Sequence, residues 1–508
     1  MYIDKRIIPA VLLAVASLYT GILVAQSADT RIKSITSAIP LIDRMFNEFG
    51  EKHQVPGFIY GLVVDGRLIH TRATGYSNIE KKIPVTTQSA FRIASMTKSF
   101  TAMAILKLRD EGRLQLDEKV EKYIPELTGQ TYLTTDAAPV TIRQLLTHAA
   151  GFPEDNPWGD RQLAIPDTAM LAMIKKGIRF SNVPGIAYEY SNMGFAMLGY
   201  IIKKVSGIPY QQYITNQILL PLGMQHTYWE YTSVPEKILT LGYRQVNGQW
   251  VKQPMLGDGA YGAMGGLITT MEDFSKYVQL HMNAWPPRND TDNGPVKRSS
   301  LREMQQAWNI NQLNAANRYP GGAPCATVSA YGYGLRWIKD CKNNVVVGHS
   351  GGLPGFGSEW RILPAYGVGI ISFGNRTYTP AALMNTQLLD TLLKVTRLTP
   401  LPLPVSPILK QRKQELLQLL PRWKNAEVSG IFAENFFLDY FTDSLRQQAT
   451  TLFKRAGKII KVHDLIPQNQ LRGSFLLEGE HSNISISFTL SPENPPLIQE
   501  YNINELKK

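Results

Sequence analysis

The chain has 508 residues, of which 44% are hydrophobic, 19% charged and 10% aromatic. This length predicts more than one domain, and the composition excludes general disorder. The mean hydropathy of -0.15 excludes a polytopic membrane protein. A net charge of +12 suits an anionic membrane or cell wall as well as nucleic acid, but no run of five Lys or Arg residues occurs. We therefore expect diffuse surface charge, association with a cell wall or membrane surface, and no nucleic-acid partner.

The N-terminal segment has the pattern of a secretory signal peptide. Lys5 and Arg6 precede an uncharged apolar stretch over residues 7–25, and Ala25-Gln26-Ser27 supplies small residues for a cleavage site. We predict a signal peptide over residues 1–27, with an uncleaved membrane anchor as the alternative. Because the positive charges stay inside, either version places the remaining chain outside the cytoplasm, in the periplasm or secreted.

Two cysteines occur, Cys325 and Cys341, and no C-x-x-C motif is present. A zinc or iron–sulfur site built on cysteines is therefore not expected. In an oxidising compartment the pair can form one disulfide, and two buried free thiols are the alternative.

The first four-fifths of the chain mixes helix and strand signals. Asp65-Gly66 between two apolar runs predicts a tight hairpin turn, and Thr270 to Asp273 predicts a helix N-cap. Strands near both ends of this region, with helices between them, predict one antiparallel sheet flanked by helices beside a helical subdomain, a mixed α/β (α+β) fold. The predicted helices are 42–53, 100–108 and 380–393, and the predicted strands are 58–64, 68–73, 345–349, 360–363 and 368–373.

A proline-rich segment over residues 398–407 carries four prolines and predicts a stiff linker. It separates a main domain over residues 35–397 from a small α+β domain over residues 408–508, in which no catalytic set is evident. Helices are predicted there over 408–420 and 432–456, and strands over 459–465, 474–478, 484–490 and 497–503.

Ser95 and Lys98 form an S-x-x-K motif at the start of a strongly apolar predicted helix. Residues three apart share one face of a helix, so the lysine can hydrogen-bond the hydroxyl. A partly desolvated lysine loses its proton more easily and can act as a base, and the helix N-terminus favours charge on the serine oxygen. The motif predicts a nucleophile with a local base; an ordinary exposed Ser and Lys are the alternative.

Two further motifs supply polar groups of the kind that acyl transfer needs. In Tyr190-Ser191-Asn192, a phenol near an ammonium can relay protons, and Asn192 can hold a lysine or a substrate amide. The same three letters at Tyr76-Ser77-Asn78 are interpreted as a turn.

The second of these motifs is the glycine-rich stretch after the strand at 345–349. Here His349 and Ser350 line the strand edge, followed by Gly351 and Gly352, whose backbone can approach a ligand closely. The N–H of Gly352, with that of Ser95, is a candidate oxyanion hole. A glycine-rich hairpin with a satisfied histidine is the alternative.

Taken in order, S-x-x-K, Y-S-N and H-S-G resemble the penicillin-recognising serine hydrolases. The Y-x-N form points to the branch of class C β-lactamases, D-alanyl-D-alanine carboxypeptidases, D-aminopeptidases and serine esterases. Two supporting segments are similar to family motifs: Leu145 to Pro153 (LLTHAAGFP) and Met264 to Phe274 (MGGLITTMEDF). The resemblance covers about residues 35–395. A weaker one links Gly430 to Phe437 and the strands after it to a small cone-like (NTF2-like) module.

The resemblance implies roles for these residues. Ser95 would be the nucleophile, Lys98 its base partner, and Tyr190 the general base and later acid. Asn192 would position the substrate, while His349, Ser350 and Gly351 replace the lysine-threonine-glycine of the β-lactamases. Histidine is mostly neutral at pH 7, so this replacement leans toward a D,D-peptidase and away from an efficient β-lactamase.

The sequence therefore predicts an exported serine hydrolase that works through an acyl-enzyme, without cofactor or metal. A D-amino-acid peptide or amide of cell-wall type is the first expectation for its substrate, a small ester the second and a β-lactam the third. A non-catalytic binding protein of the same fold is the alternative outside this class, and the complete catalytic set argues against it. The sequence does not indicate an oligomeric state.

Overall fold

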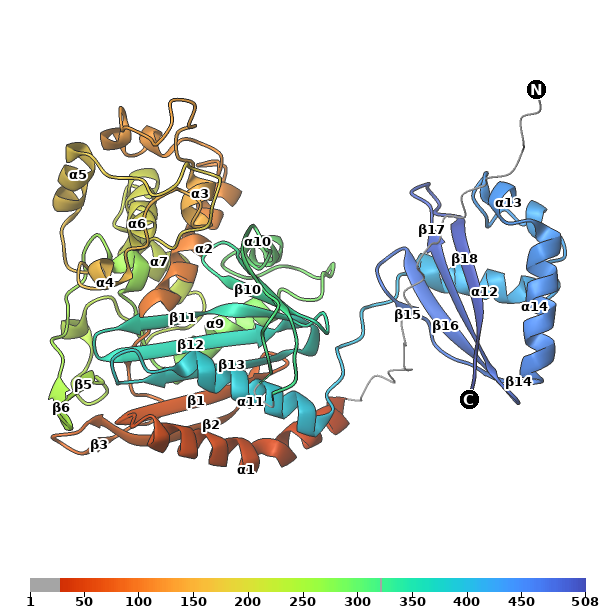
Figure 1. Ribbon diagram of the computed structural model, residues 1–508, viewed down its shortest axis with the longest axis horizontal. Coiled ribbons are helices and arrows are strands. Elements are labelled where there is room, and N and C mark those ends of the chain that lie inside the picture. Colours follow the sequence, from red (N-terminus) through yellow and green to blue (C-terminus); the bar gives the residue numbers. More distant parts are fainter. Residues whose placement is uncertain (1–27, 320–321) are drawn as a thin grey trace, which may run out of the picture.

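A computed structural model describes residues 28–319 and 322–508 (Figure 1). The signal peptide predicted over residues 1–27 lies outside the described residues. Within the described part of the chain, none of the helices combines the length and apolar character needed to cross a bilayer.

The main sheet has nine antiparallel strands and joins the two ends of the first 397 residues. β1 pairs with β13, with Phe58 opposite Gly374 and Val64 opposite Val368. This confirms the expected antiparallel sheet, and the tight turn at Asp65-Gly66 joins β1 to β2 with both residues at positive φ. The strand order is β3 (Ile83–Pro84), β2 (Arg67–Asn78), β1 (Gly57–Val64), β13 (Val368–Gly374), β12 (Phe356–Leu363), β11 (Val345–Leu353), β10 (Arg336–Asp340), β9 (Thr327–Tyr331) and β8 (Asn309–Asn314).

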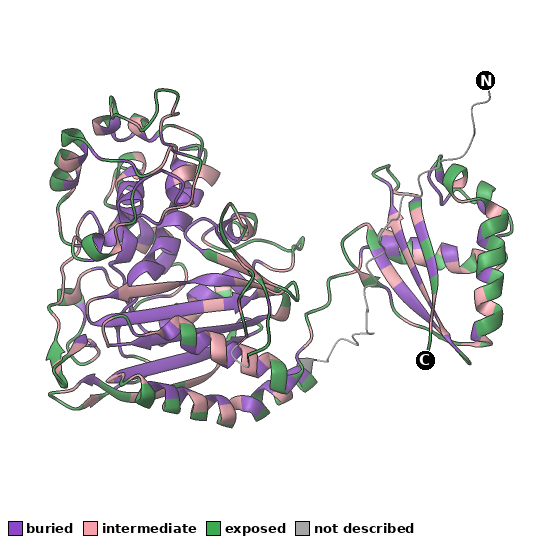
Figure 2. Ribbon diagram, viewed as in Figure 1, coloured by how far each residue is buried: buried purple, intermediate pink, exposed green. Residues whose placement is uncertain are grey.

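Helices cover both faces of this sheet, and β1 is buried along its whole length. Its even-numbered residues, such as Phe58 and Tyr60, pack with α1 (Ala28–Lys52) and α11 (Ala381–Thr396). Ile59 and Val63 pack into the larger core on the other face, which includes α2 (Thr97–Asp110) and α9 (Met271–Met282). Figure 2 shows the result: buried residues fill the central strands β1, β12 and β13, while α1 keeps an exposed outer side. The alternation of side chains along a strand explains how one strand serves two cores.

The helical subdomain lies between the two parts of the sheet in sequence and beside it in space (Figure 1). Its central helix, α6, is buried from Asn192 to Gly199 and again at Ile201 and Ile202. The elements are α3 (Ile142–Leu146), α4 (Asn156–Gly159), α5 (Asp167–Lys176), α6 (Asn192–Ser206), α7 (Tyr210–Ile214), α8 (Gly262–Gly265) and α10 (Arg298–Met304), with short strands β4 (Phe91–Arg92) and β7 (Ile268–Thr269) and a hairpin of β5 (Tyr243–Val246) and β6 (Gln249–Lys252).

Beyond the proline-rich segment, a separate hydrophobic core forms around a five-stranded sheet. The helix predicted over 432–456 is divided in two, because Tyr440 leaves the helical conformation at φ -117° and ψ 89°. The NTF2-like resemblance stays a prediction. The elements are α12 (Pro407–Leu419), α13 (Phe436–Asp439), α14 (Thr442–Ala456), β14 (Ile459–Val462), β15 (Ile466–Pro467), β16 (Arg472–Gly479), β17 (Asn483–Leu490) and β18 (Ile498–Leu506).

Two sequence interpretations are wrong. The first helix begins at Ala28 rather than at residue 42, and Pro40, a residue that disfavours helix interiors, lies inside it. Tyr76-Ser77-Asn78 is not a turn but the end of β2, where it pairs with β3. The open question about the cysteines is settled, because Cys325 and Cys341 are joined by a disulfide. The predicted N-cap is confirmed: Thr270 accepts a hydrogen bond from the backbone N–H of Asp273.

Candidate active site

Ser95 lies where the chain turns from β4 into α2. The residues Ala94–Met96 form one turn of 3₁₀ helix, and α2 follows directly. Ala94 has φ +50°, a left-handed conformation that costs energy for a residue with a Cβ atom. Strain of this kind clusters at functional sites, and here it immediately precedes the predicted nucleophile. Ser95 itself is 7% exposed, so a small part of it reaches the surface.

The Lys98 side chain is fully buried one turn after Ser95 and links three elements. Its Nζ donates hydrogen bonds to Ser95 Oγ at 3.0 Å, to Asn192 Oδ1 at 2.7 Å and to the Met264 carbonyl at 3.0 Å. These bonds account for all three donors of an ammonium group. The structure therefore brings Ser95, Lys98 and Asn192 together, as the motifs predicted.

Burial lowers the pKa of Lys98 from its ordinary value to about 7, because an apolar environment disfavours the charged form. The carboxylates of Asp155 and Asp160 oppose this shift, and Arg336 adds to it. A lysine with a pKa near 7 is partly neutral at physiological pH, so it can accept the proton of the serine hydroxyl. The expectation of a local base at Ser95 therefore has a physical basis in the fold.

Tyr190 completes the group around Ser95. The Nζ of Lys98 lies 4.8 Å from the centre of the Tyr190 ring, and the phenol is hydrogen-bonded to Ser95. Burial nevertheless raises the pKa of Tyr190 above its usual value, although Arg336 and the Ser95 bond oppose that rise. The raised pKa does not favour the general-base role of Tyr190 in this structure, and that role stays a prediction. The phenol is protonated at neutral pH and is a proton donor.

Asn192 is fixed by the start of α6. Ser191 caps this helix, and Asp155 accepts hydrogen bonds from the backbone N–H groups of Asn192 at 2.6 Å and Met193 at 2.9 Å. A carboxylate at a helix N-terminus is stabilised by the unpaired N–H groups there. The anchored backbone holds the Asn192 side chain against Lys98. Asp155 is a positioning residue that the sequence analysis did not identify.

His349 is buried on β11 and neutral. Its Nε2 lies 2.8 Å from the Tyr331 hydroxyl, and its Nδ1 lies 2.6 Å from the Ser350 carbonyl oxygen. Because a carbonyl oxygen can only accept a hydrogen bond, the proton of the neutral ring is assigned to Nδ1. Nε2 then accepts a hydrogen bond from the Tyr331 hydroxyl. Burial, Arg336 and Lys98 together lower the pKa of His349 well below its usual value. As expected from the sequence, this histidine does not bring a positive charge to the site.

The glycines that follow His349 let β11 pass close to the nucleophile. A Cβ atom added at Gly351 would lie 2.1 Å from the carbonyl oxygen of Ile93, and one at Gly352 would lie 2.6 Å from the Tyr378 ring. Ser358 on β12 also donates to the Ile93 carbonyl, at 2.7 Å. Gly351 therefore lies beside the turn that carries Ser95, whereas Gly352 lies against Tyr378. The candidate oxyanion hole at Gly352 and Ser95 stays a prediction.

We expect Gly351→Ala to impair both folding and acylation. The added methyl group must displace the Ile93 backbone, which precedes Ala94 and Ser95, so the nucleophile moves with it. Overpacking of this kind costs about 1–3 kcal/mol in the free energy of unfolding. Urea denaturation and the acylation rate measure the two effects. The control is Gly257→Ala, where the nearest atom is 3.7 Å from the added Cβ; equal behaviour of the two variants would contradict the prediction.

Arg336 on β10 is a cation that the sequence analysis missed. Its backbone lies opposite Gly348, next to His349, and its guanidinium carbon lies 5.7 Å from the centre of the Tyr190 ring. The side chain is exposed, and no Asp or Glu among the described residues forms an ion pair with it. No local pattern marks this arginine, because only the pairing of β10 with β11 brings it to the site.

Like Arg336, His148 lies beside Tyr190 and was given no role in the sequence analysis. Its ring lies 4.2 Å from that of Tyr190, and its Nδ1 accepts a hydrogen bond from the Ser191 N–H at 3.1 Å. It belongs to the segment from Leu145 to Pro153, which supported the family resemblance. Burial and Lys98 lower the pKa of His148 well below its usual value, so it is a neutral support behind Tyr190.

Within residues 28–319 and 322–508, no three His, Cys, Asp or Glu side chains are grouped so that they could hold a metal ion. The catalytic group described above consists of a hydroxyl, an amine, a phenol and an amide. These groups suffice for nucleophilic attack and proton transfer.

The family profile of the β-lactamases matches residues 42–393. The chain belongs to the β-lactamase family. The matched region contains Ser95, Lys98, Tyr190, Asn192, His349 and Arg336, so the whole site described above lies within it.

Named relatives and solved structures agree with membership of the β-lactamase family. Protein flp of Staphylococcus aureus (strain MW2) is 30% identical over 366 residues, which is 69% of this chain and 66%, just under two thirds, of that protein. Penicillin-binding protein 4* of Bacillus subtilis (strain 168) is 26% identical over 62% of this chain and 67% of its own length.

Solved structures share the fold. An octameric penicillin-binding protein homologue from Pyrococcus abyssi has a TM-score of 0.60 and 22% identity, covering 92% of this chain and 96% of that one. A class C β-lactamase has a TM-score of 0.56 and 20% identity, covering 72% of this chain and 99% of that one. This β-lactamase-family protein therefore has the fold expected from its motifs.

Proposed function

We propose that this β-lactamase-family protein is an exported hydrolase of D-amino-acid peptides or amides with a free carboxylate, of the kind found in cell walls. Membership of the family supports the serine acyl-enzyme chemistry. The narrower choice of a carboxylate-bearing substrate rests on one observation, the unpaired Arg336 beside Tyr190.

The reaction begins with attack of Ser95 Oγ on the substrate carbonyl, while neutral Lys98 takes the hydroxyl proton. The developing oxyanion is stabilised by the backbone N–H groups of Ser95 and Gly352. Tyr190 then gives its proton to the leaving amine and regains one from Lys98, and Asn192 keeps the lysine in place. A water molecule attacks the ester carbonyl by the same route in reverse, which releases the acid and restores Ser95.

Arg336 would bind the carboxylate on the leaving-group side. An exposed guanidinium offers a planar set of N–H donors that matches a carboxylate, and Arg keeps its charge at any working pH. His349 is neutral and buried, so it does not supply this charge. The cation that β-lactamases carry in their lysine-threonine-glycine motif is thus replaced by an arginine from the neighbouring strand.

We expect Arg336→Gln to reduce kcat/KM for an N-acylated D-alanyl-D-alanine dipeptide by roughly 10- to 100-fold, the range of one lost charge-assisted hydrogen bond. The same dipeptide with an amidated C-terminus should be a poor substrate of the wild type and should be affected little by the change. Steady-state kinetics on both dipeptides measure the difference.

The matched control is Lys339→Gln, which removes an exposed cation from the same strand and should leave both rates unchanged. Equal use of the acid and the amide by the wild type would contradict the proposal. Efficient cleavage of a small ester without a carboxylate, with no cleavage of either dipeptide, would instead identify a serine esterase of the same family.

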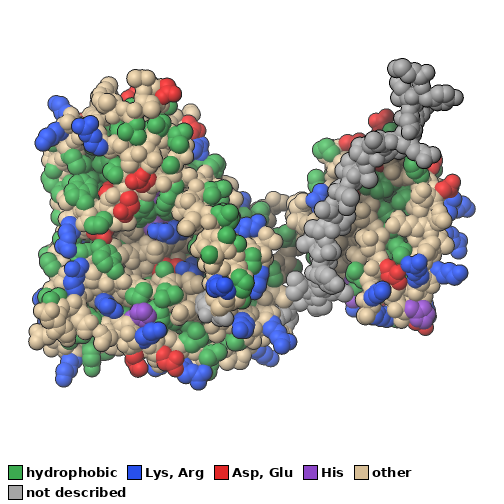
Figure 3. All heavy atoms as spheres, viewed as in Figure 1, with side chains coloured by type: hydrophobic (Ala, Val, Ile, Leu, Met, Phe, Trp, Pro, Cys, Tyr) green, Lys and Arg blue, Asp and Glu red, His purple; other side chains and the backbone are tan. Residues whose placement is uncertain are grey.

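The cellular setting belongs to the proposal as well. The signal pattern over residues 1–27 and the charge of +12 support export and contact with an anionic cell wall or membrane surface. Lys and Arg side chains lie at many separate points of the face drawn in Figure 3. The segment after residue 407 has its own hydrophobic core and would act as a binding or packing unit without catalysis.

A further inference from the structure

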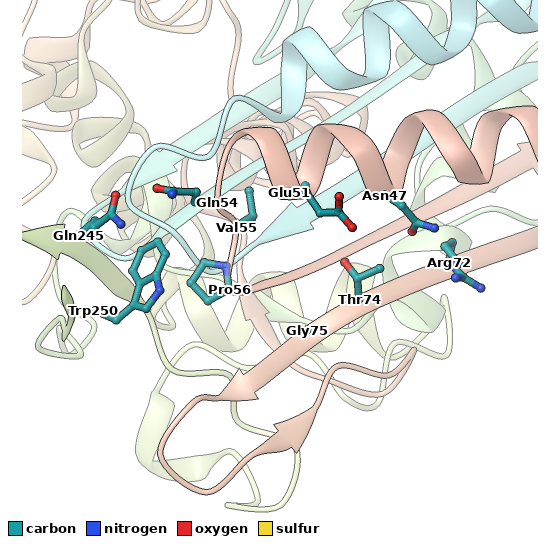
Figure 4. A pocket seen from close by; sticks show the side chains of 11 residues that line it. Asn47, Glu51, Gln54, Val55, Pro56, Arg72, Thr74, Gly75, Gln245 and Trp250 are labelled. Carbon is teal, nitrogen blue, oxygen red and sulfur yellow. The ribbon is translucent and has the colours of Figure 1, made fainter. Parts of the chain in front are cut away.

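A cavity lies away from Ser95, between the end of α1, strand β2 and the β5–β6 hairpin. It has a volume of about 560 Å³ and is drawn in Figure 4. None of its lining residues belongs to the candidate active site. Polar side chains dominate the lining, and those that matter here are Asn47, Glu51, Arg72, Thr74, Gln245 and Trp250.

Several of these polar groups have no partner within the described protein. The Oδ1 atom of Asn47 is buried and accepts no hydrogen bond. Neither Glu51 nor Arg72, both exposed, forms an ion pair with another described residue. A buried acceptor without a partner costs free energy, so native proteins leave few of them without a reason.

Trp250 closes one end of the cavity. It is half-buried on β6, opposite Gln245 on β5, and Figure 4 shows its ring beside Gln245 and Pro56. An indole presents a flat apolar face, whereas the amides of Asn47 and Gln245 offer both donors and acceptors. The indole face beside the Gln245 amide matches a sugar ring, which has one face of C–H groups and a rim of hydroxyls. The Asn47 amide lies at the other end of the cavity (Figure 4).

We propose that this cavity, the hairpin cavity, is a binding site for an oligosaccharide. A nucleotide or polyphosphate fits poorly, because Glu51 offsets the single cation Arg72. A folded protein partner fits poorly too, because protein interfaces centre on apolar or aromatic anchors and only Val55 and Pro56 accompany Trp250 here. Neutral, hydroxyl-rich ligands agree best with the lining.

The hairpin also connects this cavity to the candidate active site. At its base, the N–H of Tyr243 donates to the Asn375 carbonyl at 2.9 Å, and Gly242 packs against Gly355, in the turn after Gly351 and Gly352. A substrate that carries both a peptide and a sugar chain could therefore contact the two sites at once. This last link rests on the proposed function, whereas the saccharide site stands on its own geometry.

The test is binding of the β-1,4-linked N-acetylglucosamine tetramer to the full chain with Ser95→Ala, measured by isothermal titration calorimetry. We expect saturable binding, weakened about tenfold or more by Trp250→Ala. Val251→Ala changes an exposed residue on the same strand and should bind as the parent does. Thermal unfolding of each variant checks that the hairpin still folds.

Asn47→Leu provides a second, independent readout. Asn47 lines the cavity, so replacing its amide by an apolar side chain should weaken tetramer binding. Since Asn47 Oδ1 has no protein partner, the change should not lower the unfolding temperature. Absence of saturable binding, equal binding by Trp250→Ala, or competition by a sugar-free peptide would overturn the proposal. Because no turnover is measured, failure here leaves the proposed hydrolase function untouched, and failure of that function leaves this measurement valid.

Discussion

Ser95→Ala should abolish acylation. The variant lacks the hydroxyl oxygen that would form the ester bond. Its loss should lower turnover by roughly four to six orders of magnitude, as for other nucleophiles that act together with their base. Intact-mass spectrometry with benzylpenicillin follows the step directly. A lasting adduct on the wild type and none on Ser95→Ala is the expected result.

Ser37→Ala is the matched control, because this exposed serine bonds only to a neighbouring backbone carbonyl on α1. It should acylate as the wild type does. An adduct on Ser95→Ala would disprove the assignment of the nucleophile. Hydrolysis of a peptide by the wild type without any penicillin adduct would keep the nucleophile but show that the pocket excludes β-lactams.

The second large effect concerns Lys98. If its neutral form is the base, kcat/KM should rise about tenfold per pH unit below about pH 7 and level off above it, since the pKa of Lys98 is lowered to about 7. The pKa of Tyr190 lies above its usual value, so this phenol should cause no fall in rate at moderately alkaline pH. Initial rates between pH 5 and 9 give the profile.

Lys98→Met removes the base while keeping an unbranched side chain of similar length. We expect a loss of about 10²–10⁴ in kcat/KM, the usual worth of a general base, and a residual rate without the rise near pH 7. Lys107→Gln, on the same helix but bonded to Pro295 and Glu111, should keep both the rate and the profile. A Lys98→Met variant that retains the pH rise would show that another group titrates.

Much of the catalytic group could be predicted because it is encoded locally. Ser95 and Lys98 are three residues apart on one helix, and Tyr190 and Asn192 are two apart at the start of another, so spacing alone suggests their use. The tight turn at Asp65-Gly66 was predictable for the same reason. Each of these features depends on a few neighbouring residues.

Other features depend on tertiary contacts that no local pattern carries. Arg336 reaches the site only through the pairing of β10 with β11. The raised pKa of Tyr190 follows from burial, which outweighs the opposing effects of Arg336 and of the hydrogen bond with Ser95. The helix that begins at Ala28 includes Pro40, because packing against β1 and α11 compensates for a poor helix residue.

The pairing of β1 with β13 has a consequence for how the chain folds. Phe58 and Gly374 are adjacent in space but 374 − 58 = 316 residues apart in sequence. A ribosome adds about 5–20 residues per second, so β1 waits at least about 15 seconds for its partner strand to be made. During that time the backbone N–H and C=O groups on the β13 side of β1 have no partner strand, and its side chains, all buried in the finished fold, are open to other strands. Chains that end before residue 368 should therefore aggregate rather than yield a smaller active enzyme.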